Sequence, residues 1–188
     1  MRVQETMPRP ESLVTAEEFA RIPNDDYHYE LVEGRVVRVS PPGIRHGALA
    51  TRIAMLLAQH AGAHDLGAVI TPGGFKLATN PDTVREPDVA FVRRDRIPGA
   101  GLPDGFWPGP PDLVVEIRSP GDRQSEILAK VHDYLARGVR LVWVVDPKKR
   151  TVAVHRPGAD PETLGADDTL DGGDVVAGFS CAVLRIFD

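Results

Sequence analysis

The stretch PPDLVVEIRSP, residues 110–120, contains an apolar run, LVVEI, that holds one carboxylate, Glu116. A continuous apolar run of this length predicts a strand buried on both faces. Acidic residues are strongly depleted from buried strands, because removing an unpaired carboxylate from water is costly. The stretch therefore predicts a central strand and an unusual environment for Glu116.

The residues after this strand predict a strand–helix–strand unit. Ser119 or Asp122 is a suitable N-cap for the helix, which should stop at Gly138. The expected buried stripe of this helix consists of Ile127, Leu128, Val131, Tyr134 and Leu135. The next strand, LVWVVD (141–146), should lie parallel to the first, and TVAVHR (151–156) should pair back after a turn.

The first half of the chain carries hairpin and helix signals. Thr15 and Glu18 form a capping-box pattern for a short helix. The segment YHYELVEGRVVRVSP (27–41) is typical of a hairpin, and residues 45–61 have the periodicity of an amphipathic helix.

Three further strands are expected before residue 94. GAVITP (67–72) and GFKLAT (74–79) should pair with each other around two glycines, and PDVAFV (87–92) should follow as a separate strand. Together with the later strand–helix–strand unit, this order predicts an α/β (α+β) fold with a mixed β-sheet flanked by helices.

Composition limits the class of protein. A chain of 188 residues with 42% hydrophobic and 26% charged residues is expected to form a single globular domain, 1–188. No apolar run has the length of a membrane span, so no membrane partner is expected, and the single Cys181 makes a cytoplasmic location the default. The net charge of −5 argues against indiscriminate nucleic-acid binding, although basic residues cluster at 93–96 and 148–150.

Two acidic residues at strands suggest a metal site. Asp88 begins one strand, Glu116 lies near the end of another, and Arg118 should share the face of Glu116 because strand side chains repeat every two residues. Two carboxylates that share Mg²⁺, with a cation nearby to hold phosphate, suit phosphodiester hydrolysis. The alternative is structural: Asp88 forms a turn, and Glu116 pairs with Arg118 or with a helix residue.

Several short motifs in order resemble one family. They are YELVEGRVV, a helix opening with His46, EPDVAFV, PDLVVEIRSP, a lysine in the next helix, YLARGVRLVWVVDP and a final IF. This order is similar to that of the Uma-type restriction endonucleases, a branch of the PD-(D/E)XK nuclease superfamily, from about residue 27 to 187. The resemblance implies a restriction-endonuclease-like core with an N-terminal hairpin and helix, and a nuclease site that uses Mg²⁺, or Mn²⁺ as a substitute, on DNA.

The resemblance also assigns site residues. Asp88 matches the aspartate of the PD motif and Glu116 the acid of the (D/E)XK motif, and by analogy the backbone carbonyl of Ile117 is a further metal ligand. Arg118 stands where the motif has lysine, and it effectively never loses its proton. Lys130 is the candidate substitute, since related families place the lysine in the following helix.

Two residues are possible additions to this site. Glu30 in YELVEG could supply a third carboxylate, although a hairpin acid is commonly solvated. His46 shares a helix face with apolar residues, which favours a packed or capping histidine over a ligand.

The leading hypothesis is a Mg²⁺-dependent DNA endonuclease, which would cut both strands most simply as a homodimer. One alternative is a nuclease-fold protein that binds DNA or another partner through a decayed site, which Arg118 and the acidic net charge favour. Another is a metal-dependent hydrolase of a smaller phosphoester.

Overall fold

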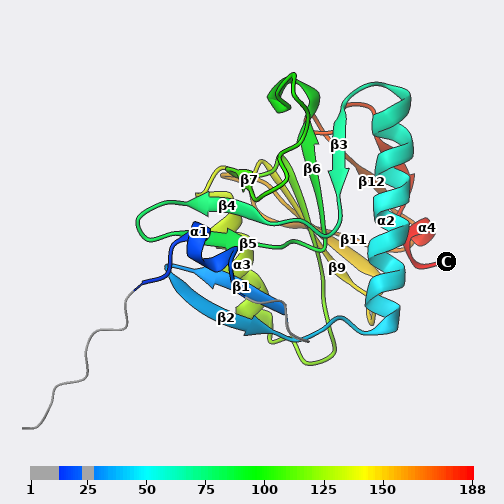
Figure 1. Cartoon of the computed structure of the whole chain (residues 1–188). Coiled ribbons are helices and arrows are strands. Elements are labelled where there is room, and N and C mark those ends of the chain that lie inside the picture. The colour runs from blue at the N-terminus through cyan, green and yellow to red at the C-terminus, as the bar shows by residue number, and fades with distance from the viewer. Residues whose placement is uncertain (1–12, 23–27) are drawn as a thin grey trace, which may run out of the picture.

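The computed structural model describes residues 13–22 and 28–188, and most of its strands belong to two sheets (Figure 1). The larger sheet has the order β11–β10–β9–β8–β6–β3. Its strands are β3 (Gly67–Ile70), β6 (Val89–Arg93), β8 (Leu113–Ile117), β9 (Leu141–Asp146), β10 (Thr151–His155) and β11 (Glu162–Leu164). β8 and β9 are parallel, whereas β6 and β8 are antiparallel. All residues of β8 are buried, so LVVEI is the central strand that its composition predicts.

Helix α3 (Gln124–Ala136) makes the crossover between β8 and β9. The prediction that Ser119 or Asp122 caps this helix is wrong, because the N-cap is Arg123. The Ser119 N–H instead donates to Asp122 Oδ2 at 2.7 Å, which closes the turn before the helix. The predicted helix end is correct, since Gly138 follows with φ 98°, a conformation that glycine adopts without strain.

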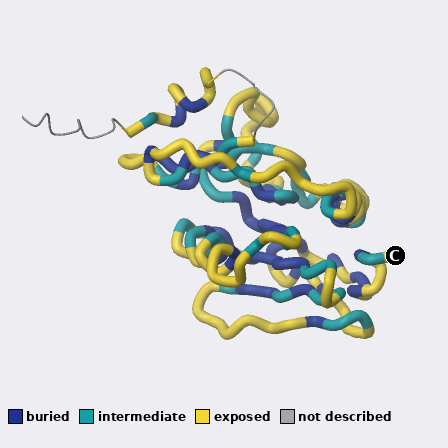
Figure 2. Tube along the Cα trace, turned by 90° about the horizontal axis from the view of Figure 1, so that it is seen from below, coloured by how far each residue is buried: buried dark blue, intermediate teal, exposed yellow. Residues whose placement is uncertain are grey.

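The two faces of the larger sheet are covered by different elements. Odd-numbered residues of β6, β8 and β9 pack with Leu49, Ile53 and Leu57 of α2 (Ile44–Ala63), whereas even-numbered residues pack with α3. The chain's last elements, β12 (Thr169–Asp171), β13 (Ser180–Ala182) and α4 (Leu184–Phe187), add to the α2 side. Figure 2 shows the buried stretches mostly inside the trace and the exposed residues mostly along its outer side.

The smaller sheet has the order β2–β1–β5–β4–β7. Its strands are β1 (His28–Val32), β2 (Arg35–Val39), β4 (Phe75–Ala78), β5 (Thr83–Arg85) and β7 (Trp107–Pro108). The predicted hairpin is confirmed as β1 and β2, although Tyr27 lies outside the described residues. The capping box of Thr15 and Glu18 is also present, at the start of α1 (Ala16–Phe19).

The expected pairing of residues 67–72 with 74–79 is wrong. β3 pairs with β6 in the larger sheet, whereas β4 pairs with β5 and β7 in the smaller one. Gly73 and Gly74 serve close packing here: a Cβ on Gly73 would lie 2.3 Å from Ile70 Cγ2, and one on Gly74 would lie 2.4 Å from Phe106 Cδ1. The two glycines therefore lie where the chain passes from one sheet to the other.

Two smaller observations complete the fold. Leu128 was expected in the buried stripe of α3, but it is 38% exposed. The buried stripe is therefore narrower than predicted, and its buried residues are Ile127, Val131 and Tyr134. The loop between β6 and β7 holds a single 3-10 turn, η1 (Arg94–Arg96). Within the described ranges, no helix combines the length and apolar character that a bilayer span needs.

Candidate active site

The pairing of β6 with β8 brings Asp88 and Glu116 together. Val89 pairs with Val115 and Ala90 with Val114, so the same register places Asp88 opposite Glu116. The Ile117 N–H donates to Asp88 Oδ2 at 2.7 Å, which ties this carboxylate to the end of β8. Both acids are even-numbered, as are the residues of these strands that face α3. The structure thus places the two carboxylates next to each other where β6 begins and β8 ends.

Glu116 is buried, and α3 supplies both of its side-chain partners. The Tyr134 hydroxyl donates to Glu116 Oε1 at 2.7 Å, and Lys130 Nζ lies 3.5 Å from Oε2. Burial raises the pKa of Glu116 from 4.5 to about 7, although Lys130 acts in the opposite direction. The charge of Asp88 raises this pKa further, so the two carboxylates are close enough to interact.

Lys130 lies between two carboxylates. Its Nζ is 3.2 Å from Glu30 Oε1 and 3.5 Å from Glu116 Oε2. Burial lowers the pKa of Lys130, but Glu116 and Glu30 raise it by more, so this side chain stays protonated at neutral pH. The helix edge that carries Lys130 and Tyr134 therefore faces the end of β8.

His46 also belongs to this cluster. Its Nε2 is 3.1 Å from Asp88 Oδ2, and that hydrogen bond is the main reason why the pKa of His46 is raised. Ile117 and Glu116 raise it further. The helix N-cap is Gly43, so His46 does not cap α2 but contacts Asp88, which the sequence proposes as a metal ligand.

Arg118 contacts a different acid. Its Nη1 is 3.1 Å from Asp146 Oδ2, at the end of β9, and its Nη2 donates to the Asp122 carbonyl at 3.4 Å. Asp146 Oδ1 accepts the N–H groups of Lys148 and Lys149 at 3.0 Å, so this carboxylate also closes the following turn. The cation that pairs with Glu116 is thus the helix residue Lys130 and not Arg118.

Arg85 is the site neighbour that sequence reasoning missed. Its Nη1 lies 2.7 Å from Glu30 Oε2, and its Nη2 lies 3.1 Å from Asp133 Oδ2. The only signal in the sequence is a basic residue at the end of an otherwise buried strand, TVR. Tyr134 was expected in the buried stripe of α3, and it is buried there, but its hydrogen bond to Glu116 was not predicted.

The donor groups around Asp88 and Glu116 suit a hard divalent cation. The carboxylates of Asp88 and Glu116 are close enough to interact, and the charge of Lys130 is shared between Glu116 and Glu30. No group of three or more His, Cys, Asp or Glu side chains that could hold a metal occurs among the described residues. Mg²⁺ typically uses one or two protein carboxylates and keeps several waters, so a pair of acids and a carbonyl would suffice.

The pKa of Glu116 predicts how Glu116→Gln changes stability with pH. A folded-state pKa near 7, above 4.5, means that the folded protein loses stability as pH rises from about 4.5 to 7. Without divalent cations, Glu116→Gln should therefore stabilise the fold at pH 8 by about 1–3 kcal/mol, and by less at pH 5. Urea unfolding at both pH values measures this difference.

Glu162→Gln, an exposed acid on β11, is the control and should change stability little at either pH. If Glu116→Gln destabilised the protein equally at both pH values, the buried carboxylate would contribute to the stability of the fold.

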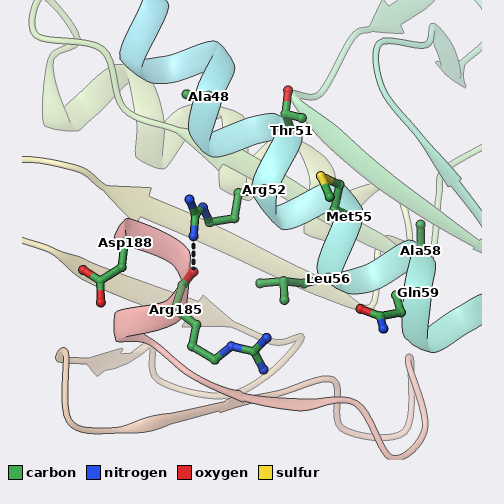
Figure 3. Close-up of a pocket in the computed structure, with 9 residues that line it drawn as sticks. All are labelled: Ala48, Thr51, Arg52, Met55, Leu56, Ala58, Gln59, Arg185 and Asp188. Carbon is green, nitrogen blue, oxygen red and sulfur yellow. Dashed lines mark hydrogen bonds between the residues drawn. The ribbon is translucent and has the colours of Figure 1, made fainter.

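A groove lies outside the carboxylate cluster (Figure 3). It measures about 1070 Å³ and is formed by α2 and α4, with Arg52 Nη1 donating to the Arg185 carbonyl at 3.5 Å. Its lining residues are Ala48, Thr51, Arg52, Met55, Leu56, Ala58, Gln59, Arg185 and Asp188. None of these residues belongs to the carboxylate cluster.

The mixed α+β fold is of a nuclease-like class. The fold resembles the crystal structure of a putative nuclease belonging to DUF820 from Anabaena variabilis ATCC 29413, with a TM-score of 0.81 and 21% sequence identity over 93% of this chain and 97% of that chain. A profile of the Uma2 family, described as a putative restriction endonuclease, matches residues 16–184. The chain belongs to the Uma2 family, which confirms the predicted relationship and fold. No curated protein matches it.

Proposed function

We propose that this protein is a Mg²⁺-dependent DNA endonuclease. The observation that carries the proposal is the placement of Asp88 opposite Glu116 at the ends of two central strands, with Lys130 beside Glu116. Membership of a nuclease family supports phosphodiester hydrolysis as the reaction and DNA as the substrate. Asp88, Glu116 and the carbonyl of Ile117 are the groups that would hold the cation, which would activate water and offset charge on the phosphate.

The protein's own residues would orient and stabilise the reacting groups. Lys130 carries a permanent positive charge beside Glu116, where it can stabilise negative charge that develops on the phosphate. Tyr134 fixes the rotamer of Glu116 through its hydroxyl, as residues behind metal ligands commonly do. His46 Nε2 lies 3.1 Å from Asp88 Oδ2, and this hydrogen bond raises the pKa of His46.

Basic groups near the candidate site suit a phosphate backbone. Arg45 directly precedes His46, and its Nη2 donates to the Pro147 carbonyl at 2.9 Å. This contact joins the start of α2 to the turn that carries the exposed Lys148 and Lys149. Exposed cations beside a carboxylate cluster can hold DNA phosphates although the net charge of the chain is −5.

A nuclease-fold protein without cleavage activity is the second candidate. Arg118 replaces the motif lysine and is bound to Asp146, which favours a decayed site. Lys130 argues against decay, because this residue of α3 places an ammonium group 3.5 Å from Glu116 although the motif position holds Arg118. We further propose a homodimer as the form that cuts duplex DNA, since one site attacks one strand at a time.

Cleavage should require a divalent cation. Purified protein is expected to nick or linearise plasmid DNA with Mg²⁺ or Mn²⁺ and to be inactive in EDTA. Single-stranded DNA, RNA and a chromogenic phosphodiester, tested in parallel, measure the substrate class. Cleavage of the small phosphodiester alone would favour a hydrolase of smaller substrates, and DNA binding without cleavage would favour the second candidate.

A further inference from the structure

A chain of charged side chains connects the smaller sheet to α3. Arg85 comes from β5 and Glu30 from β1, and both belong to the smaller sheet. Glu30 contacts Lys130 of α3, which in turn contacts Glu116 of the larger sheet. The ammonium group of Lys130 is therefore shared between carboxylates from two different sheets.

Both oxygens of Glu30 are occupied by cations. Arg85 Nη1 lies 2.7 Å from Oε2, and Lys130 Nζ lies 3.2 Å from Oε1. The side chain of Glu30 is only 3% exposed, so it has little room to turn toward another partner. Arg85 is itself fixed, because Asp133 Oδ2 accepts from its Nε at 3.2 Å and from its Nη2 at 3.1 Å.

The position of Lys130 depends on this arrangement. A lysine has a flexible four-carbon stem, so a single carboxylate leaves its ammonium group free to take many positions. Glu30 supplies a second acceptor from a different strand than Glu116, and the two acceptors together define where Nζ lies. Displacing a catalytic group by about 1 Å can lower a reaction rate on the order of 100-fold.

We infer that Glu30 is a positioning residue, which holds the ammonium of Lys130 beside Glu116, and that Arg85 holds Glu30 in turn. The inference rests on the proposed function, because it assigns Lys130 a part in cleavage. It distinguishes Glu30 from Asp88 and Glu116: Glu30 binds the lysine and not the metal.

The test compares Glu30→Gln in two backgrounds. In the otherwise unchanged chain, Glu30→Gln should lower kcat about 10- to 100-fold, while the KM for DNA and the affinity for Mn²⁺ stay within about 2-fold. In the Lys130→Met background, Glu30→Gln should cause no further loss of kcat, because Glu30 acts through Lys130. Arg85→Lys, which keeps the charge, should retain more activity than Arg85→Met.

Asp82→Asn is the matched control, because it breaks another buried ion pair, with Lys76 at 3.0 Å, away from this cluster. It should leave kcat unchanged and so exclude a general effect of lost stability. A fall in Mn²⁺ affinity in Glu30→Gln would overturn the inference and make Glu30 a metal ligand. An equal further loss in the Lys130→Met background would also overturn it. A wild-type protein that neither binds Mn²⁺ nor cleaves would overturn the proposed function, and the role of Glu30 with it.

Discussion

Asp88→Asn is expected to abolish DNA cleavage, with a loss of rate on the order of 1000-fold or more. The amide keeps the size of the carboxylate and one oxygen that can accept the Ile117 N–H, so the end of β8 should keep its structure. It removes the negative charge that would hold the cation opposite Glu116. Gel assays of plasmid cleavage measure the loss of activity, and calorimetric titration with Mn²⁺ measures the loss of cation binding.

Asp95→Asn is the control for this change. Asp95 lies in the exposed turn η1, where its carboxylate pairs only with Arg93 in the described contacts, and its substitution should alter neither cleavage nor Mn²⁺ binding. Retained cleavage in a folded Asp88→Asn protein would place the metal ligands elsewhere in the chain.

Lys130→Met should reduce turnover by about 100- to 1000-fold while DNA binding changes little. Methionine keeps a long unbranched side chain next to Val131 and Tyr134, so the packing of α3 should persist. What is lost is the positive charge 3.5 Å from Glu116 Oε2. Single-turnover rates at saturating DNA, together with binding measured in Ca²⁺, separate the chemical step from affinity.

Two variants accompany Lys130→Met. Lys76→Met removes a lysine that also pairs with a buried acid, Asp82, and it should leave turnover unchanged. Arg118→Lys should be tolerated or mildly harmful, because Arg118 binds Asp146 and not Glu116. If Lys130→Met were silent and Arg118→Lys raised the rate, the motif position itself would carry the catalytic cation.

Local sequence signals predicted the segment from β8 to β9 well. This segment consists of an apolar run, an amphipathic stripe that ends at Gly138, and a second apolar run. Each of these patterns depends only on residues close together in the sequence, so they predict a strand, a helix and a strand. The position of Glu116 in a buried strand also signalled that it needed a partner. The sequence left its charged partner open between Arg118 and a helix residue, and the structure shows that this partner is Lys130.

Long-range pairing was predicted less well. The residues of GAVITP and GFKLAT do not indicate that these strands join different sheets. Strand pairing depends on packing against residues that are far away in the sequence. The contact of Arg85 with Glu30 and Asp133 is of the same kind, since it joins residues 55 and 48 positions apart. Sequence periodicity carries no information on such pairs.

The separation of the cluster along the chain has a consequence for biosynthesis. Glu30 lies 100 residues before Lys130, and Asp88 and Glu116 lie between them. Synthesis proceeds from the N-terminus, so all strands of the smaller sheet are synthesised before α3. A chain still being translated through β8 therefore holds the carboxylates without the lysine. If the protein is the proposed endonuclease, a nascent chain could not complete its active site before α3 has emerged and folded.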